Sequence, residues 1–144
     1  MTEDTDSNRL LNAVLPFAQQ MLGKHGTFLP FGASVSASGE VDLCQGMPDT
    51  DSEQAVLDML VSALRQQALD GTIRGSALCY DSRVTTPGGG QKQEAICVEL
   101  EHASERCARL FLPYRKGFLK RISYGQLFGS TQEPRIFEER SEAG

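Results

Sequence analysis

The strongest constraint on this chain is a two-residue alternation of apolar and polar side chains between Glu94 and Tyr114. Apolar residues occupy every second position in 96–100 and again in 108–112. Such alternation is typical of strands with one buried face, and two consecutive runs indicate a hairpin. A slip of one residue would turn the apolar set of a strand to the other face, so the loop must hold an odd number of residues. With residues 103–105 as the loop, we predict that Val98 faces Leu110 inside and Glu99 faces Arg109 in solvent.

A second hairpin is predicted between Gly26 and Cys44 by the same parity rule. Residues 37–39 (Ala-Ser-Gly) form its loop, with the glycine at the position that favours a left-handed conformation. This loop pairs Val35 with Val41 and Ala33 with Leu43.

Two amphipathic helices are predicted. In the first, from Ser7 to Leu22, apolar residues recur every three or four positions. Ser7 can cap its start, and Pro16 should either kink the helix or make it begin late. The second begins at the capping-box sequence 50–53 (Thr-Asp-Ser-Glu) and ends at Asp70-Gly71.

Further strands are expected after the second helix. Residues 72–84 carry apolar side chains on both faces, which favours a central strand. Three glycines at 88–90 lack the Gly-Lys-Ser/Thr ending of a phosphate-binding loop, so they indicate a hairpin loop. Beyond Arg115 the pattern becomes irregular; we predict a short helix at 118–127 and a last segment docked by Ile136 and Phe137.

These elements, in the order αββαβββ with an irregular C-terminal tail, predict an α+β fold. Its two helices should pack on one face of an antiparallel sheet of about five strands. Residues 1–144 are expected to form a single domain, with 1–6 and 138–144 frayed. The order resembles that of roadblock-type and profilin-like domains, a resemblance that implies a dimerising or binding platform.

Charge is unevenly distributed along the 144 residues, whose net charge is −5. Residues 1–70 carry ten carboxylates against three basic side chains, whereas residues 71–144 carry eleven basic side chains against nine acidic ones. Overall acidity argues against a dedicated nucleic-acid binder. No membrane span or secretory signal is evident, so we expect a cytoplasmic protein that does not enter a membrane.

The four cysteines form no CxxC motif, and all fall in predicted strands, where reduced cysteine acts as a small hydrophobe. The predicted register separates Cys97 from Cys107 by roughly 13 Å along the ladder, which excludes a disulfide between them.

Few residues suit catalysis. His25 and His102, the only histidines, belong to no metal-spaced cluster or nucleophile motif and are predicted to be exposed in loops. Glu99 and Glu101 share a strand face that should be solvated, so a charge pair with Arg109 is a better interpretation than acid/base chemistry. We predict a non-catalytic protein without metal or cofactor.

The sharpest candidate site is a basic stretch, 106–121, which contains no acid and has aromatic residues interleaved. Such a surface could bind an acidic protein or a second copy of this chain, a phosphate-bearing ligand or a single-stranded nucleic acid, or it could be a solvated rim. The predicted binding residues are Arg109, Arg115, Lys116, Phe118, Lys120, Arg121 and Tyr124.

The leading hypothesis is therefore a protein-interaction or adaptor domain that self-associates. One alternative is a small-molecule or nucleotide-binding domain with a pocket between sheet and helices near Phe28, Phe31 and Tyr80. Another is a weak single-stranded nucleic-acid binder that uses the basic stretch.

Overall fold

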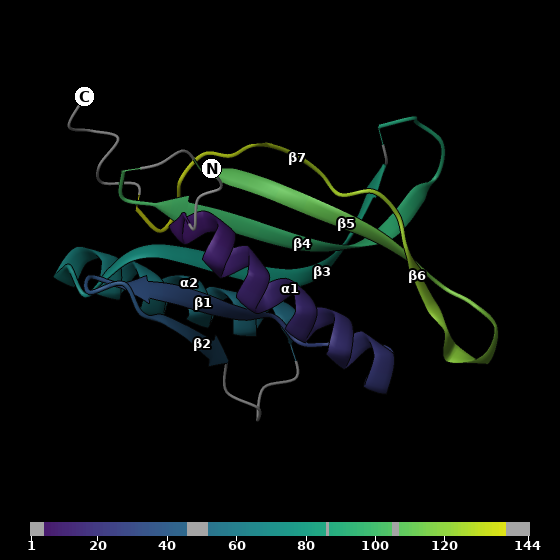
Figure 1. Ribbon diagram of the computed structural model, residues 1–144, viewed down its shortest axis with the longest axis horizontal. Coiled ribbons are helices and arrows are strands. Elements are labelled where there is room, and N and C mark those ends of the chain that lie inside the picture. Colours follow the sequence, from purple (N-terminus) through teal and green to yellow (C-terminus); the bar gives the residue numbers. More distant parts are fainter. Residues whose placement is uncertain (1–4, 46–51, 86, 105–106, 138–144) are drawn as a thin grey trace.

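The computed structural model describes residues 5–45, 52–85, 87–104 and 107–137 (Figure 1). Two helices, α1 (Asp6–His25) and α2 (Glu53–Asp70), accompany a sheet of seven strands. The strands are β1 (Phe31–Ser36), β2 (Val41–Gln45), β3 (Ile73–Thr85), β4 (Lys92–His102), β5 (Ala108–Lys116), β6 (Ile122–Tyr124) and β7 (Phe128–Thr131), and a 3-10 helix, η1 (Phe118–Lys120), precedes β6. The α+β class and the antiparallel sheet are confirmed, with seven strands instead of about five.

The sheet has the order β2-β1-β3-β4-β5-β6, and β7 also pairs with β5. Both predicted hairpin registers are confirmed: Val98 lies opposite Leu110 in one, and Val35 lies opposite Val41 in the other. The turn between β1 and β2 places Gly39 at φ 97°, the left-handed conformation expected from its loop. Strand β3 is central, as predicted, and pairs with β1 and β4.

The helices lie on opposite faces of the sheet, so the prediction that both cover one face is wrong. Helix α1 packs on the face that carries Ala77 and Cys79, whereas α2 packs on the face that carries Leu78. Consecutive residues of a strand point to opposite faces, so these two contacts cannot share a side. Figure 1 shows α1 in front of the sheet and α2 behind it.

The N-terminal end of each helix is capped by a side chain. Thr5 accepts a hydrogen bond from Asn8 N at 3.1 Å, so α1 starts before the predicted cap Ser7 and includes Asp6, which had been expected to fray. Ser52 accepts from Ala55 N at 3.1 Å and caps α2. Residues 50–51 of the predicted capping box, and the predicted frayed segments 1–4 and 138–144, lie outside the described residues.

The C-terminal region is more regular than predicted. The expected helix at 118–127 is wrong, because only η1 is helical there and Ile122–Tyr124 forms β6. Strand β6 pairs with residues 114–116 of β5, and β7 pairs with residues 108–111. The outer edge of β5 thus finds hydrogen-bonding partners that a helix in this region would not supply.

Residues 132–137, here called the C-terminal clamp, cover the second face of the sheet beside α2. Ile136 and Phe137 are 3% and 7% exposed and join the core between α2 and the sheet. This docking confirms the prediction made for these two residues.

Candidate functional site

The β5–β6 hairpin extends from the end of the sheet beyond the body of the molecule (Figure 1). Its tip carries Phe118 and Leu119, which are 84% and 76% exposed, more than any other large apolar side chain in the described part of the chain. Adjacent exposed apolar side chains of this size do not contribute to the core, so they indicate a contact surface.

The backbone of the tip reinforces this interpretation. Leu119 has φ 60° and ψ 36°, and it is the one residue other than glycine with positive φ among those described. A left-handed conformation costs a side-chain-bearing residue about 1–2 kcal/mol, and glycine would adopt it without that cost. Leu119 is exposed, so no burial in the core compensates for this strain. Backbone strain of this kind is concentrated at functional sites.

Cations flank the apolar tip. Arg115, Lys116 and Arg121, here called the basic collar, are exposed, and none forms an ion pair within the described residues. The side chain of Lys120 lies outside the described part. Arg109 belongs elsewhere, because it lies on the clamp side of the sheet and donates to Gln132 Oε1 at 3.0 Å. Nearby negative charge comes from Glu94, which lines a hollow together with Arg115 and Lys116, and from Asp81, which interacts electrostatically with Lys116.

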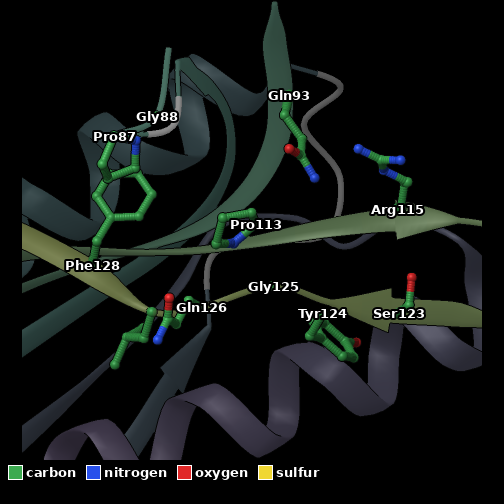
Figure 2. A pocket seen from close by; sticks show the side chains of 11 residues that line it. Pro87, Gly88, Gln93, Pro113, Arg115, Ser123, Tyr124, Gly125, Gln126 and Phe128 are labelled. Carbon is green, nitrogen blue, oxygen red and sulfur yellow. The ribbon is translucent and has the colours of Figure 1, made fainter. Parts of the chain in front are cut away.

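A groove of about 520 Å³ runs along the base of the same hairpin (Figure 2). Figure 2 shows the polar groups of Gln93, Arg115 and Ser123 toward one end, and the rings of Pro87 and Phe128 at the other. The groove therefore offers a cation and hydrogen-bonding groups beside an apolar surface, the combination typical of specific binding sites.

The hairpin is anchored by its other face. Tyr114 is 1% exposed, and Ile122 and Tyr124 pack against the same core as α1. Tyr114 donates its hydroxyl to Asp81 Oδ1 at 2.7 Å, and burial raises the pKa of Asp81 above its ordinary value. Tyr124, predicted to bind a ligand, is thus partly an anchoring residue, although it also lines the groove.

The residues of the predicted sheet–helix pocket do not line one pocket. Phe28 and Phe31 are 3% and 2% exposed in the core under α1, where each packs edge-on against another aromatic ring. Tyr80 points to the opposite face, since Phe31 lies opposite its neighbour Cys79. It donates a hydrogen bond to Glu99 there.

Glu99 and Glu101 were predicted to be solvated, but they are 2% and 1% exposed beneath the C-terminal clamp. Glu101 accepts backbone hydrogen bonds from Arg135 at 2.9 Å, Ile136 at 2.8 Å and Phe137 at 3.0 Å. Glu99 accepts from Arg135 Nε at 3.1 Å, and its predicted pairing with Arg109 is confirmed at 3.8 Å. The two carboxylates therefore hold the clamp on the sheet.

His102 was predicted to be exposed but is 5% exposed within a polar cluster. Its Nε2 lies 2.7 Å from Asp6 Oδ2, and its Nδ1 lies 3.3 Å from Ser104 Oγ, an order of groups similar to a catalytic triad. However, Ser104 N also donates to Nδ1 at 3.1 Å, so that lone pair is occupied and cannot serve as a general base for the hydroxyl. A hydrogen bond from Arg74 keeps the pKa of Asp6 well below its ordinary value, so this carboxylate is a charged anchor between α1 and the sheet.

Other chemistry finds little support in the described part of the chain. It contains no group of three or more His, Cys, Asp or Glu side chains placed to hold a metal ion. All four cysteines are free, which agrees with the predicted reduced state, and burial raises the pKa of Cys97 to about 11. Neither described helix is long and apolar enough to span a membrane.

The fold and the site together define a small α+β domain that presents a basic hairpin with an apolar tip. The chain matches no protein-family model, no curated protein and no solved structure.

Proposed function

We propose that this chain is a non-catalytic interaction domain that binds an acidic protein partner through the β5–β6 hairpin. The observation that carries the proposal is the tip, where Leu119 is exposed and holds a left-handed backbone beside the exposed Phe118. A partner that buries these two side chains would remove apolar surface from water and so gain binding free energy.

The partner's chemistry follows from the surroundings of the tip. The basic collar favours a surface with carboxylates, and attraction between unlike charges would speed association. The neighbouring groove adds an apolar end at Phe128 and a polar end at Arg115, which suits a chain segment with an apolar side chain next to an acidic one. A protein supplies both features together, and this favours it over a bare phosphate or a nucleic acid.

Recovery of the tagged protein from its producing cells, followed by quantitative mass spectrometry, tests the proposal. The forms compared are wild type, Phe118→Ser, Arg115→Glu and, as control, Leu69→Ser, which removes an apolar side chain that is 63% exposed on α2. We expect a protein that wild type and the control retain, and that each hairpin variant loses by at least about thirtyfold, as for a residue that dominates an interface.

Equal recovery in all four forms would contradict the proposal. So would binding of the purified protein to phosphatidylserine vesicles or to single-stranded DNA that depends on Phe118 when no protein partner is recovered. Because the substituted side chains are exposed, circular dichroism should show all four forms folded.

A further inference from the structure

The other edge of the sheet is β2, which has no further strand beside it in the described part of the chain. It pairs only with β1 within the described residues, whereas the outer side of β5 is covered by β6 and β7. Its five residues, 41–45, contain neither proline nor lysine, and Asp42 is the one charged side chain that could protect this edge. Leu43 is 46% exposed on this edge.

The hairpin geometry shows which backbone groups of β2 are free to pair. Ser36 N donates to Glu40 O at 2.8 Å, so the groups of Glu40 point toward β1. Because the direction alternates along an antiparallel strand, Asp42 and Cys44 also point toward β1. The N–H and C=O groups of Val41, Leu43 and Gln45 therefore point outward.

We infer that β2 is the site at which a second copy of this chain pairs, antiparallel and about a two-fold axis at Leu43. This register uses all five residues of the strand and places Val41 opposite Gln45 of the second copy. The outward-pointing residues then form the hydrogen-bonded pairs of the new ladder, which is the arrangement that an antiparallel pair requires. Identical surfaces meeting in this way form a closed dimer.

Charge favours the register with its axis at Leu43 over the register with its axis at Asp42. A two-fold axis at Asp42 would place two like charges directly opposite each other, which is unfavourable. With the axis at Leu43, Asp42 lies opposite Cys44 of the second copy, and the two Leu43 side chains become neighbours. Leu43 shares its face with Ala33, which is in the core under α1, so both α1 helices would lie on one face of a continuous sheet.

The dimer should be weak, because a five-residue strand spans only about 17 Å and the contact falls below the roughly 1,200 Å² of a standard interface. It leaves both β5–β6 hairpins free, since they lie at the opposite edge of the sheet. The inference is thus independent of the proposed function, and a dimer would present two hairpins.

Hydrogen exchange at 5 µM and 500 µM protein, read at single residues by NMR, tests the inference. We expect protection that rises at least fivefold with concentration at the amides of Val41, Leu43 and Gln45, and no change at Asp42 and Cys44, which already bond to β1. Leu43→Lys, which places two cations together at the axis, should abolish the increase, whereas Leu69→Lys should leave it intact. Concentration-independent exchange at the three outward amides would overturn the inference, as would an increase that Leu43→Lys leaves unchanged.

Cross-linking provides a second readout that does not depend on the stability of a lysine variant. In a Cys44→Ser background, Leu43→Cys places two thiols across the axis at about 5.5 Å between Cα atoms, within the range of a disulfide. Under a glutathione redox buffer we expect covalent dimer from Leu43→Cys and none from Leu69→Cys in the same background. Equal dimer yields from the two would overturn the proposed register.

Discussion

Replacing Glu101 by Gln should detach the C-terminal clamp from the sheet. The Oε1 atom of Glu101 accepts from Ile136 N and Phe137 N, and Oε2 accepts from Arg135 N. An amide can keep only one of these oxygens, and its NH₂ group would face a backbone N–H that can only donate. The variant therefore leaves at least one donor of the clamp without an acceptor.

The magnitude follows from these contacts. An unsatisfied buried N–H costs about 1–3 kcal/mol, and each bond that changes from a charged to a neutral acceptor loses about 1 kcal/mol. Weaker desolvation of the neutral amide offsets part of this loss. We expect a net destabilisation of about 2–3 kcal/mol. Because Ile136 and Phe137 are buried by the same contact, the loss should open the clamp before the sheet.

Urea unfolding and residue-resolved hydrogen exchange measure these two effects. Exchange at the amides of residues 135–137 should accelerate by about thirtyfold or more in Glu101→Gln, since each 1.4 kcal/mol is a factor of ten. The control is Glu133→Gln, which changes an exposed carboxylate of the same clamp and should alter neither measurement. A Glu101→Gln protein within 0.5 kcal/mol of wild type, with unchanged exchange at these amides, would refute the reasoning.

Three further predictions concern stability. Leu119→Gly should raise the free energy of unfolding by about 0.5–1 kcal/mol, because glycine adopts the left-handed conformation without the strain that leucine has there. The same variant should recover less of the partner. A loss of stability in urea would contradict the assigned strain. Gly32→Ala should destabilise the protein by about 1–3 kcal/mol, because the added Cβ would lie 2.8 Å from the backbone oxygen of Ala77. Gly88→Ala, whose added Cβ would have no atom within 4 Å, should leave the stability unchanged in the same assay. Equal effects of the two substitutions would contradict the assigned steric clash. Asp6→Asn should lower the free energy of unfolding by about 2 kcal/mol at pH 7. This difference from wild type should shrink as the pH falls below about 4, because folding lowers the pKa of Asp6 and the unfolded wild type therefore takes up a proton before the folded protein does. A difference that stays constant down to pH 2 in urea titrations would contradict the assignment.

Local rules predicted the parts of the fold that depend on neighbours in sequence. Parity along the strands was sufficient for the Val98–Leu110 and Val35–Val41 pairings, because side-chain alternation ties register to the buried face. Helix caps were predicted to within a few residues for the same reason: the donors and the capping oxygens are adjacent in the chain.

Contacts between distant segments could not be predicted in this way. Glu99 and Glu101 alternate like solvent-facing residues, and nothing near them reveals a cover that comes from about thirty-five residues later. One signal did exist: β3 is apolar on both faces, so each face needed its own cover, which argues for helices on both sides.

The candidate site was predicted in part. The stretch from Arg115 to Arg121 does gather on one hairpin, but a sequence pattern could not show that the hairpin projects or that Leu119 holds a left-handed backbone. Arg109 lies apart from the other basic residues because it is at the start of β5, where this strand pairs with β7, whereas Arg115 and Lys116 are at its end beside β6.

The central claim is that the hairpin tip contacts a protein partner, and a photo-reactive phenylalanine analogue at position 118 tests it most directly. Irradiation in the producing cells should yield a defined protein adduct from position 118, which Arg115→Glu removes, and no such adduct from the same analogue at position 69. Absence of a protein adduct at position 118, or the same adducts from both positions, would contradict the account.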